Sequence, residues 1–300
     1  MRATAIIPTI GRPELRRAVE SVTQQSVQVD VLVTLDRPEK GAEVRAMLHD
    51  YPHRLVLTSG NIGGGAARNL GVARSATEVV AFLDDDDVWA PTKTEAQLEQ
   101  LTAKPDSVIA TRAWLQSEAS ARLVPERPFD NSASIVDYLL DRSTMRLRRN
   151  FIQSSSLMMT RSTAIKVPWR ADLSRHQDWT LLIDLARAGH EIVTMRDPLV
   201  YVHQGSNGSI SRSTNWSASE EWLDHLEVPI SRRSAGDFLC SVAVRSALAA
   251  GDLKNATRLL RRGLRYGPHP AAVLVGLSSI PALVSRRRSI RSAGKASSSV

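Results

Sequence analysis

The residues best suited to do chemistry form one run of four adjacent aspartates, Asp84 to Asp87, directly after the apolar segment Val79–Leu83. Four carboxylates in a row repel one another in a dry site, so water or a cation must neutralise them. Carboxylate oxygens are hard ligands that suit Mg²⁺ or Mn²⁺. Because ligands of open α/β sheets collect at the carboxyl ends of strands, the run predicts a metal-assisted phosphate site.

A solvated loop is the alternative interpretation, since runs of like charge usually face water. Two observations favour the metal site: apolar residues flank the run on both sides, and the segment before it has the composition of a buried strand. An EF-hand is excluded because its alternating ligands, central glycine and closing glutamate are missing.

The elements that must position the run alternate between strands and helices. Strands are predicted at Ala3–Pro8, Val29–Leu35, Arg54–Leu57, Val79–Leu83, Val108–Leu115, Ile152–Thr160 and Ile192–Val202. Helices are predicted from Pro13, at Gly41–Leu48, at Pro91–Leu101 and at Trp179–Ala188. Residues 118–150 are expected to form a loop and a helix over the site. This alternation is typical of an α/β protein with a parallel sheet.

A glycine-rich turn, Gly63-Gly64-Gly65, leads into a helix that carries Arg68 and Asn69. Backbone N–H groups at a helix start, together with a guanidinium, can cradle a diphosphate. A dinucleotide fingerprint is excluded because Arg68 stands where its third glycine would fall. A flexible turn without a ligand remains the alternative.

Two further titratable groups follow. Asp178 stands at the start of the predicted helix Trp179–Ala188, where it is either an N-cap or a general base at the mouth of a cleft, with His176 nearby as a second candidate. His203 follows the last predicted strand and is a candidate extra metal ligand.

The net charge of +8 is concentrated at the C-terminal end. Residues 231–300 hold 13 Lys or Arg against 2 Asp or Glu, so the rest of the chain carries a net charge of −3. No basic stripe with a nucleic-acid reading motif is evident, so nucleic acid is not an expected partner. The single Cys240 excludes an intramolecular disulfide and suits a reducing compartment.

The C-terminal part predicts two helices, Phe238–Ala250 and Leu253–Leu264, joined at Gly251-Asp252. The apolar, arginine-flanked segment 271–291 is too short to span a bilayer, and we expect it to contact an anionic membrane surface peripherally. The alternative is that it packs as core. The end of the chain, 292–300, is expected to be disordered. The sequence shows neither a signal peptide nor a spanning segment. We therefore expect a cytoplasmic protein that is at most peripheral at the inner face of the plasma membrane.

Taken together, these motifs resemble a family 2 glycosyltransferase of the GT-A fold over residues 3–212. The matching pieces are Ile7-Pro8-Thr9, Asp36, Ala67-Arg68-Asn69, the run Phe82–Asp87 with Pro91, and Gln177-Asp178-Trp179. The run resembles the metal-binding Asp-x-Asp motif of that family. The last piece resembles its base motif, usually Glu-Asp, with Gln177 in the first position.

The resemblance implies an α/β, Rossmann-like nucleotide-diphospho-sugar transferase with a mixed, mostly parallel sheet and a C-terminal helical segment. It implies a hexosyltransferase that transfers a sugar with inversion from a nucleotide-diphosphate donor, expected to be a UDP-sugar. The acceptor would be a hydroxyl of a glycan or of a lipid-linked molecule, in cell-envelope or polysaccharide biosynthesis. The implied donor-binding residues are Pro8, Thr9, Asp36, Arg68, Asp84 and Asp85. Asp86 is implied to bind Mn²⁺ or Mg²⁺, with the register inside the run left open, and His203 is the candidate extra ligand from its position in the sequence. Asp178 is implied to be the base.

The implied domains are a catalytic domain (1–218), a helical hairpin (219–268) and the apolar, basic tail (269–300). Two other functions remain open. One is a scaffold that binds sugar nucleotides without catalysis. The other is a pyrophosphorylase-like nucleotidyltransferase, although Pro8-Thr9-Ile10-Gly11-Arg12-Pro13 stands where such enzymes carry a glycine-rich, basic loop.

Overall fold

The computed structural model describes residues 1–117, 120–146, 149–203 and 214–279. The chain divides into two compact units, which we describe separately. Unit 1 comprises residues 1–135 and 148–208, and unit 2 comprises residues 136–147 and 209–300. The predicted boundaries of a catalytic domain, a hairpin and a tail stay a prediction.

Unit 1 is built on a nine-stranded mixed sheet with the order β3-β2-β1-β4-β8-β6-β9-β5, in which β7 pairs with β6. The strands are β1 (Ala3–Thr9), β2 (Val29–Leu35), β3 (Arg54–Leu57), β4 (Val79–Phe82), β5 (Val88–Trp89), β6 (Val108–Ser117), β7 (Ser120–Val124), β8 (Leu157–Thr160) and β9 (Ile192–His203). Strands β3, β2, β1 and β4 run parallel, whereas β8 is antiparallel to both β4 and β6. The predicted α/β class with a mixed sheet is confirmed.

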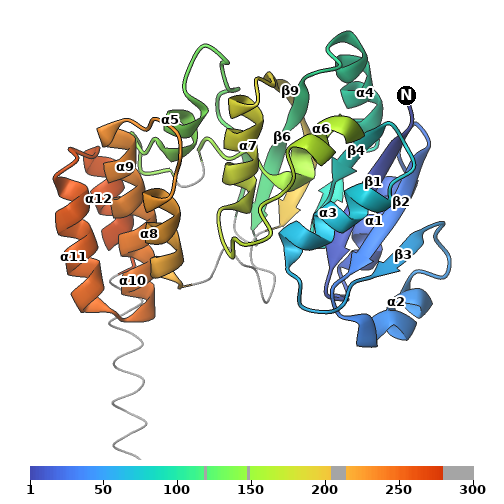
Figure 1. The fold of residues 1–300 in the computed structure, drawn as a ribbon, viewed down its shortest axis with the longest axis horizontal. Coiled ribbons are helices and arrows are strands. Elements are labelled where there is room, and N and C mark those ends of the chain that lie inside the picture. Colours follow the sequence, from blue (N-terminus) through green and yellow to red (C-terminus); the bar gives the residue numbers. More distant parts are fainter. Residues whose placement is uncertain (118–119, 147–148, 204–213, 280–300) are drawn as a thin grey trace, which may run out of the picture. The chain divides into compact units, whose positions relative to one another are not determined.

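The helices of unit 1 are α1 (Leu15–Thr23), α2 (Gly41–Met47), α3 (Gly64–Arg74), α4 (Lys93–Ala103), α6 (Arg161–Lys166) and α7 (Gln177–Arg187). Figure 1 shows α3 and α6 side by side over β1 and β4. Gly71 makes this packing possible, because a Cβ at that position would lie 2.4 Å from the Ile6 side chain.

The core explains why the acidic run lies where it does. All four residues of β4 are buried, and so is Leu83, the next residue of the chain. Alternating residues of the neighbouring strands, such as Ala5, Ile7 and Val33, pack into the same core. Because β1, β2 and β4 are parallel, their carboxyl ends bring Thr9, Asp36 and the run to one edge of the sheet.

Two local predictions need correction. The segment Ile152–Thr160 is not one strand: Ser154–Ser156 form a short 3-10 helix, and β8 begins only at Leu157. The serines are buried because their hydroxyls bind the acidic run and backbone oxygens, a role that hydrophobic patterning does not reveal. Strand β7, a hairpin partner of β6, was also missed inside the region expected to be loop and helix.

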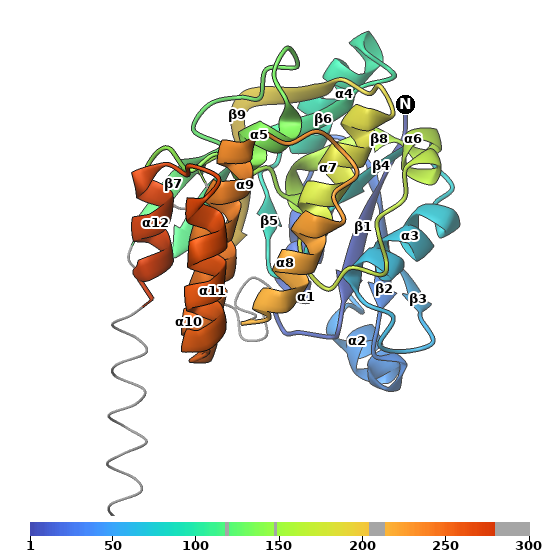
Figure 2. The ribbon, with the colours of Figure 1, turned by 60° about the vertical axis from the view of Figure 1, so that its left-hand side comes forward.

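The described part of unit 2 is helical, with α5 (Ile135–Leu140) entering it, followed by α8 (Trp216–Asp224), α9 (Arg232–Phe238), α10 (Arg245–Ala250), α11 (Leu253–Leu264) and α12 (Pro270–Leu277). Helix α9 continues through a π-helical segment, Leu239–Val244, into α10. Figure 2 shows α10, α11 and α12 lying alongside one another.

The predicted turn between the two C-terminal helices is confirmed. Gly251 adopts a left-handed conformation with φ 83°, and the Asp252 carboxylate caps α11 by accepting from the Asn255 N–H at 3.0 Å. In the described ranges no helix is both long and apolar enough to cross a membrane. The predicted disordered end, residues 292–300, and the arginines at 286–288 lie outside the described residues.

Candidate active site

The acidic run alternates between partly exposed and buried side chains. The side chains of Asp84 and Asp86 are 26% and 16% exposed, against 8% for Asp85. Asp87 is only 1% exposed. The run itself forms a turn, in which the Asp87 N–H donates to the Asp84 carbonyl at 3.1 Å. Two carboxylates reach toward solvent and two are held within the protein.

The buried Asp85 is held from the loop after β1. The Thr9 hydroxyl donates to Asp85 Oδ2 at 2.6 Å and accepts from the Gly11 N–H, and Arg12 Nη1 lies 3.3 Å from Asp85 Oδ1. Burial raises the pKa of Asp85 to about 6, and the Thr9 hydrogen bond and the Arg12 charge oppose that shift. The same Arg12 nitrogen lies 3.4 Å from Asp86 Oδ2, so one guanidinium serves two members of the run.

Asp87 is held from the opposite side. Its Oδ2 accepts from Gln153 Nε2 at 2.5 Å and from the Ser155 hydroxyl at 2.6 Å, and its Oδ1 accepts from the His203 backbone N–H at 3.2 Å. Burial, followed by the charges of Asp84 and Asp86, raises the pKa of Asp87 well above its usual range. This carboxylate links the run to β9 and to the short 3-10 helix Ser154–Ser156, which we call the serine turn.

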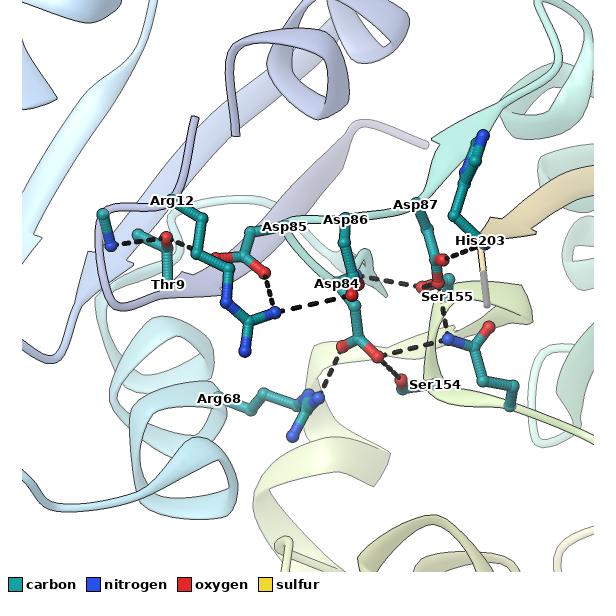
Figure 3. A network of polar contacts seen from close by, with 12 residues as sticks. Thr9, Arg12, Arg68, Asp84, Asp85, Asp86, Asp87, Ser154, Ser155 and His203 are labelled. Atoms are coloured by element: carbon teal, nitrogen blue, oxygen red, sulfur yellow. Dashed lines mark hydrogen bonds and ion pairs between the residues drawn. The ribbon is translucent and has the colours of Figure 1, made fainter. Parts of the chain in front are cut away.

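Asp84 joins both halves of the site. Figure 3 shows its carboxylate between Arg68 and Ser154, while Asp85 points toward Arg12. Arg68 Nη2 donates to Asp84 Oδ1 at 2.5 Å, and the Ser154 hydroxyl donates to Oδ2 at 2.9 Å. The Asp84 backbone N–H donates to the Ser155 hydroxyl at 2.9 Å, which fixes the direction in which the run leaves β4.

Arg68, on the first turns of α3, is buried against Trp169, with its guanidinium carbon 4.6 Å from the ring centroid. Burial alone would lower its pKa, but the charges of Asp84 and Asp178 outweigh burial and leave the pKa raised. Its Nη1 also lies 3.5 Å from Gln177 Oε1. Arg68 therefore stays charged between the acidic run and the start of α7.

Asp36, after β2, organises the glycine-rich turn. Its carboxylate accepts from the Thr58 hydroxyl at 2.7 Å and from the backbone N–H groups of Ile62 and Gly63, each at 2.9 Å. Gly63 has φ 85°, a conformation that glycine adopts without strain, and α3 begins at the next residue. Pro8 lies near the end of β1, one residue before Thr9.

Asp178 lies in the first turn of α7 and is partly buried. The preceding His176 has φ 60° and stacks on Trp179 with ring centroids 4.9 Å apart. Burial, helped by Arg175, lowers the pKa of His176 to about 3, so the imidazole is neutral at physiological pH. The predicted N-cap role does not apply to Asp178, because the capping position is His176.

His203 ends β9, next to Asp87. Burial and the charge of Arg17 lower its pKa, against an opposing contribution from Asp86. Among the described residues, its buried Nδ1 has no hydrogen-bond partner. The backbone N–H of His203 contacts Asp87, whereas Figure 3 shows its imidazole pointing away from the carboxylates of the run, so its role as a metal ligand stays a prediction.

Comparison with known proteins decides the family. Residues 4–165 match the model of Glycosyl transferase family 2. The chain belongs to this family, and it is a glycosyltransferase. The matched range contains the acidic run, the glycine-rich turn and the serine turn, whereas Asp178 and His203 lie beyond it.

Curated relatives of this glycosyltransferase include two proteins of Erwinia amylovora. The amylovoran biosynthesis glycosyltransferase AmsB is 25% identical over 77% of this chain and 79% of its own length. The amylovoran biosynthesis glycosyltransferase AmsE is 23% identical over 73% of this chain and 82% of its own length.

Solved structures support the fold. S. aureus TarS 1–349 in complex with UDP-GlcNAc aligns with a TM-score of 0.63 and 13% identity over 96% of this chain and 88% of that structure. The mannosyltransferase PcManGT from Pyrobaculum calidifontis, in complex with GDP-Man and Mn²⁺, aligns with a TM-score of 0.54 and 16% identity over 96% of this chain and 82% of that structure. The fold of this family 2 glycosyltransferase is therefore of the GT-A type, as the sequence resemblance implied.

Sequence reasoning missed several residues of this glycosyltransferase site. Arg12, Gln153, Ser154 and Ser155 bind the run directly, and Trp169 supports Arg68. Three serines inside an otherwise apolar segment were the available signal, because buried hydroxyls need partners.

A separate group in unit 2 has ligand atoms close enough together for a metal: Asp141, Asp237 and His269. Protein donors already occupy both oxygens of Asp237, which accept from the backbone N–H groups of Arg142 and His269 and pair with His269 Nδ1 at 2.7 Å. We therefore interpret this group as a structural hydrogen-bond cluster that fixes the start of α12.

Proposed function

We propose that this protein is a metal-dependent, inverting glycosyltransferase of the hexosyltransferase type that moves a sugar from a nucleotide-diphosphate donor, a UDP-sugar, to a hydroxyl acceptor. The alternation within the acidic run carries the proposal. All four carboxylates contact protein donors, but Asp85 and Asp87 are buried, whereas Asp84 and Asp86 present partly exposed carboxylates two residues apart. This spacing supports a register in which Asp84 and Asp86 face the donor and its metal.

The residues of the site fit a divalent cation. Four carboxylates face only two guanidinium groups, Arg12 and Arg68, so acidic groups outnumber basic ones, and a bound cation would favour the ionised carboxylates. Asp86 would hold Mn²⁺ or Mg²⁺ together with Asp84, two residues away in the run, and His203 stays a proposed further ligand through its Nδ1. When bound, the cation would offset the negative charge that builds on the departing nucleoside diphosphate.

The chain's own groups divide the remaining work. The nucleoside part of the donor would be bound by Pro8, Thr9 and Asp36, at the ends of β1 and β2. Asp85 would contribute by holding the Thr9 hydroxyl in place. Arg68 would face the diphosphate, with its charge preserved by Asp84 and oriented by the Trp169 ring.

Asp178 would act as the base that takes the proton from the acceptor hydroxyl. Three observations support this role: it stands at the start of α7, it is only partly buried, and it lies within the electrostatic reach of Arg68. Inversion requires attack from the face opposite the leaving group, so one base is sufficient and no covalent nucleophile is needed.

A polysaccharide or another cell-envelope glycan is the acceptor class that we infer. The support is the printed function of the two Erwinia relatives, both amylovoran biosynthesis glycosyltransferases. A UDP-sugar donor is supported by the TarS complex with UDP-GlcNAc, although PcManGT binds GDP-Man.

Donor turnover tests the proposal. Purified protein is incubated with UDP-, GDP- and dTDP-sugars in the presence of Mn²⁺, Mg²⁺ or EDTA, and released nucleoside diphosphate is measured. We expect metal-dependent release from a UDP-sugar, and Asp178→Asn should abolish transfer while donor affinity changes little. Metal-dependent donor binding without turnover would favour a scaffold, and release of pyrophosphate from a nucleoside triphosphate and a sugar phosphate would indicate a nucleotidyltransferase.

We further propose a peripheral membrane contact through unit 2. Leu264, at the end of α11, and Leu274, on α12, are 51% and 55% exposed. The exposed Arg261 lies on the last turn of α11, and the exposed Arg265 caps that helix. Exposed leucines among arginines suit an anionic bilayer surface. We expect cosedimentation with phosphatidylglycerol vesicles but not with phosphatidylcholine vesicles, and Leu264→Ser together with Leu274→Ser should weaken it. Equal partitioning of wild type and variant would refute this contact.

A further inference from the structure

Lys93, the first residue of α4, is completely buried. Lysine is almost never fully buried without a partner, because its ammonium loses the solvation of water. Burial accordingly places the pKa of Lys93 well below its usual range. Neither the donor site nor the base described above uses this side chain, so its retention in the core needs another explanation.

Lys93 contacts two neighbours of different kinds. Its Nζ donates to Gln97 Oε1 at 2.6 Å, one turn further along α4. The same nitrogen lies 3.7 Å from the centroid of the Trp89 ring, on β5. Both neighbours are buried as well, at 0% and 2% exposure.

These two neighbours support the serine turn. The Trp89 indole N–H donates to the Ser155 carbonyl at 2.9 Å. Gln97 Nε2 donates to the Ser156 carbonyl and to the Ile109 carbonyl, each at 2.8 Å. Two successive carbonyls of the turn are thus held by the two side chains that Lys93 contacts.

The serine turn in turn orients the acidic run. The Ser154 hydroxyl donates to Asp84 and the Ser155 hydroxyl donates to Asp87, while the Asp84 N–H donates back to Ser155. A displacement of the turn by a few tenths of an ångström would therefore move both carboxylates. Groups that orient metal ligands from behind typically change metal affinity by about 10- to 100-fold when they are removed.

We propose that Lys93 is a positioning residue for the acidic run, acting through Trp89 and Gln97 on the serine turn. It keeps the indole N–H and the glutamine amide aimed at the two carbonyls, and the serine hydroxyls hold Asp84 and Asp87 in place. The link from Lys93 to the turn stands on the geometry alone, whereas its effect on metal affinity rests on the proposed function.

Lys93→Met is the decisive variant, because it keeps the length of the side chain and removes Nζ. Lys104→Met is the matched control: it removes a lysine at the other end of the same helix, where Nζ is exposed and pairs with Glu191. Trp89→Phe is the second variant, since it keeps an aromatic ring and removes the indole N–H together with the rest of the five-membered ring. It keeps the test decisive if Lys93→Met does not fold.

Two readouts separate positioning from general stability. The first is hydrogen–deuterium exchange of peptides covering residues 150–160, where we expect faster exchange in Lys93→Met and Trp89→Phe but not in Lys104→Met. The second is the Mn²⁺ concentration that gives half-maximal donor turnover. We expect it to rise about tenfold in both test variants, with kcat recovering at saturating Mn²⁺.

The outcomes are distinguishable. Unchanged exchange in residues 150–160 in a folded Lys93→Met or Trp89→Phe protein would overturn the inference. Faster exchange with an unchanged Mn²⁺ requirement would also overturn it, because Lys93 would then stabilise the turn without positioning the run. A wild-type protein without metal-dependent turnover would refute the proposed function, and the exchange measurement would still test the structural link.

Discussion

Replacing Asp86 and Asp87 one at a time by Asn should separate a metal ligand from a structural carboxylate. The two residues are adjacent and chemically identical, and the replacement conserves size. Asp86 is partly exposed and has Arg12 as a neighbour, whereas Asp87 is buried and accepts three hydrogen bonds. The two variants should therefore lose different properties.

The expected cost for Asp87→Asn follows from its contacts. Gln153 and Ser155 both donate to Oδ2, and the His203 N–H donates to Oδ1. An asparagine can present its oxygen to only one of these two places, so its NH₂ group must face a donor at the other. Leaving one buried donor without an acceptor costs about 1–3 kcal/mol. At about 2–4 °C per kcal/mol for a domain of this size, 2 kcal/mol lowers the melting temperature by about 4–8 °C.

Asp86→Asn should behave in the opposite way. A substitution at a partly exposed position changes stability by about 0.5 kcal/mol or less, so its melting temperature should shift by no more than about 2 °C. Loss of a charged ligand should raise the Mn²⁺ concentration for half-maximal turnover by at least about 100-fold, beyond the range for groups that only orient ligands.

Differential scanning fluorimetry and Mn²⁺ titration of donor turnover measure both quantities on the same preparations. A stable Asp87→Asn protein with lost metal dependence, next to an Asp86→Asn protein that melts early but binds Mn²⁺ normally, would refute the assignment. It would shift the Asp-x-Asp motif by one residue, to Asp85 and Asp87.

Three further predictions concern other parts of the chain. Asn69→Ala removes both hydrogen bonds to the Trp169 backbone, so steady-state kinetics should show kcat reduced by about tenfold with donor KM nearly unchanged, because the loop toward Asp178 loosens. Gly71→Ala places a Cβ 2.4 Å from a β1 side chain and should destabilise by about 1–3 kcal/mol in urea unfolding. Hydrogen bonding from Arg258 lowers the pKa of Glu220 below its usual value. The wild-type protein should therefore have a larger free energy of unfolding than Glu220→Gln at pH 7, and urea unfolding should show this difference disappear as the pH falls through the pKa of Glu220 in the folded protein.

The sequence predicted the strand and helix alternation well because apolar composition and turn residues are local signals. Val79–Phe82 is buried on both faces, so its continuous apolar run identified a central strand. Asp252 and Gly251 carried the cap and turn chemistry of their helix boundary in their residue types alone. Such elements depend little on residues far away in the chain.

The orientation of the acidic run could not be read in the same way. Its alternation is set by Thr9 from one side and by Ser155 from the other, which are separated from the run by about 70 residues in each direction. Arg12 was similarly hidden, because only the parallel pairing of β1 and β4 brings its loop to the run. The serine turn was mistaken for part of a strand because its polarity serves the site rather than the fold.

Gln177 shows how one departure from the family pattern fits its surroundings. Its Nε2 donates to the Leu173 carbonyl at 2.6 Å, while its Oε1 lies 3.5 Å from Arg68. A glutamate could not donate to that carbonyl, so the loop before α7 would lose a hydrogen bond. Its charge would also draw Arg68 away from Asp84, the carboxylate that now holds it. A neutral amide therefore holds the loop and leaves the charge of Arg68 to the acidic run and to Asp178, the two groups to which we assign roles in transfer under the proposed function.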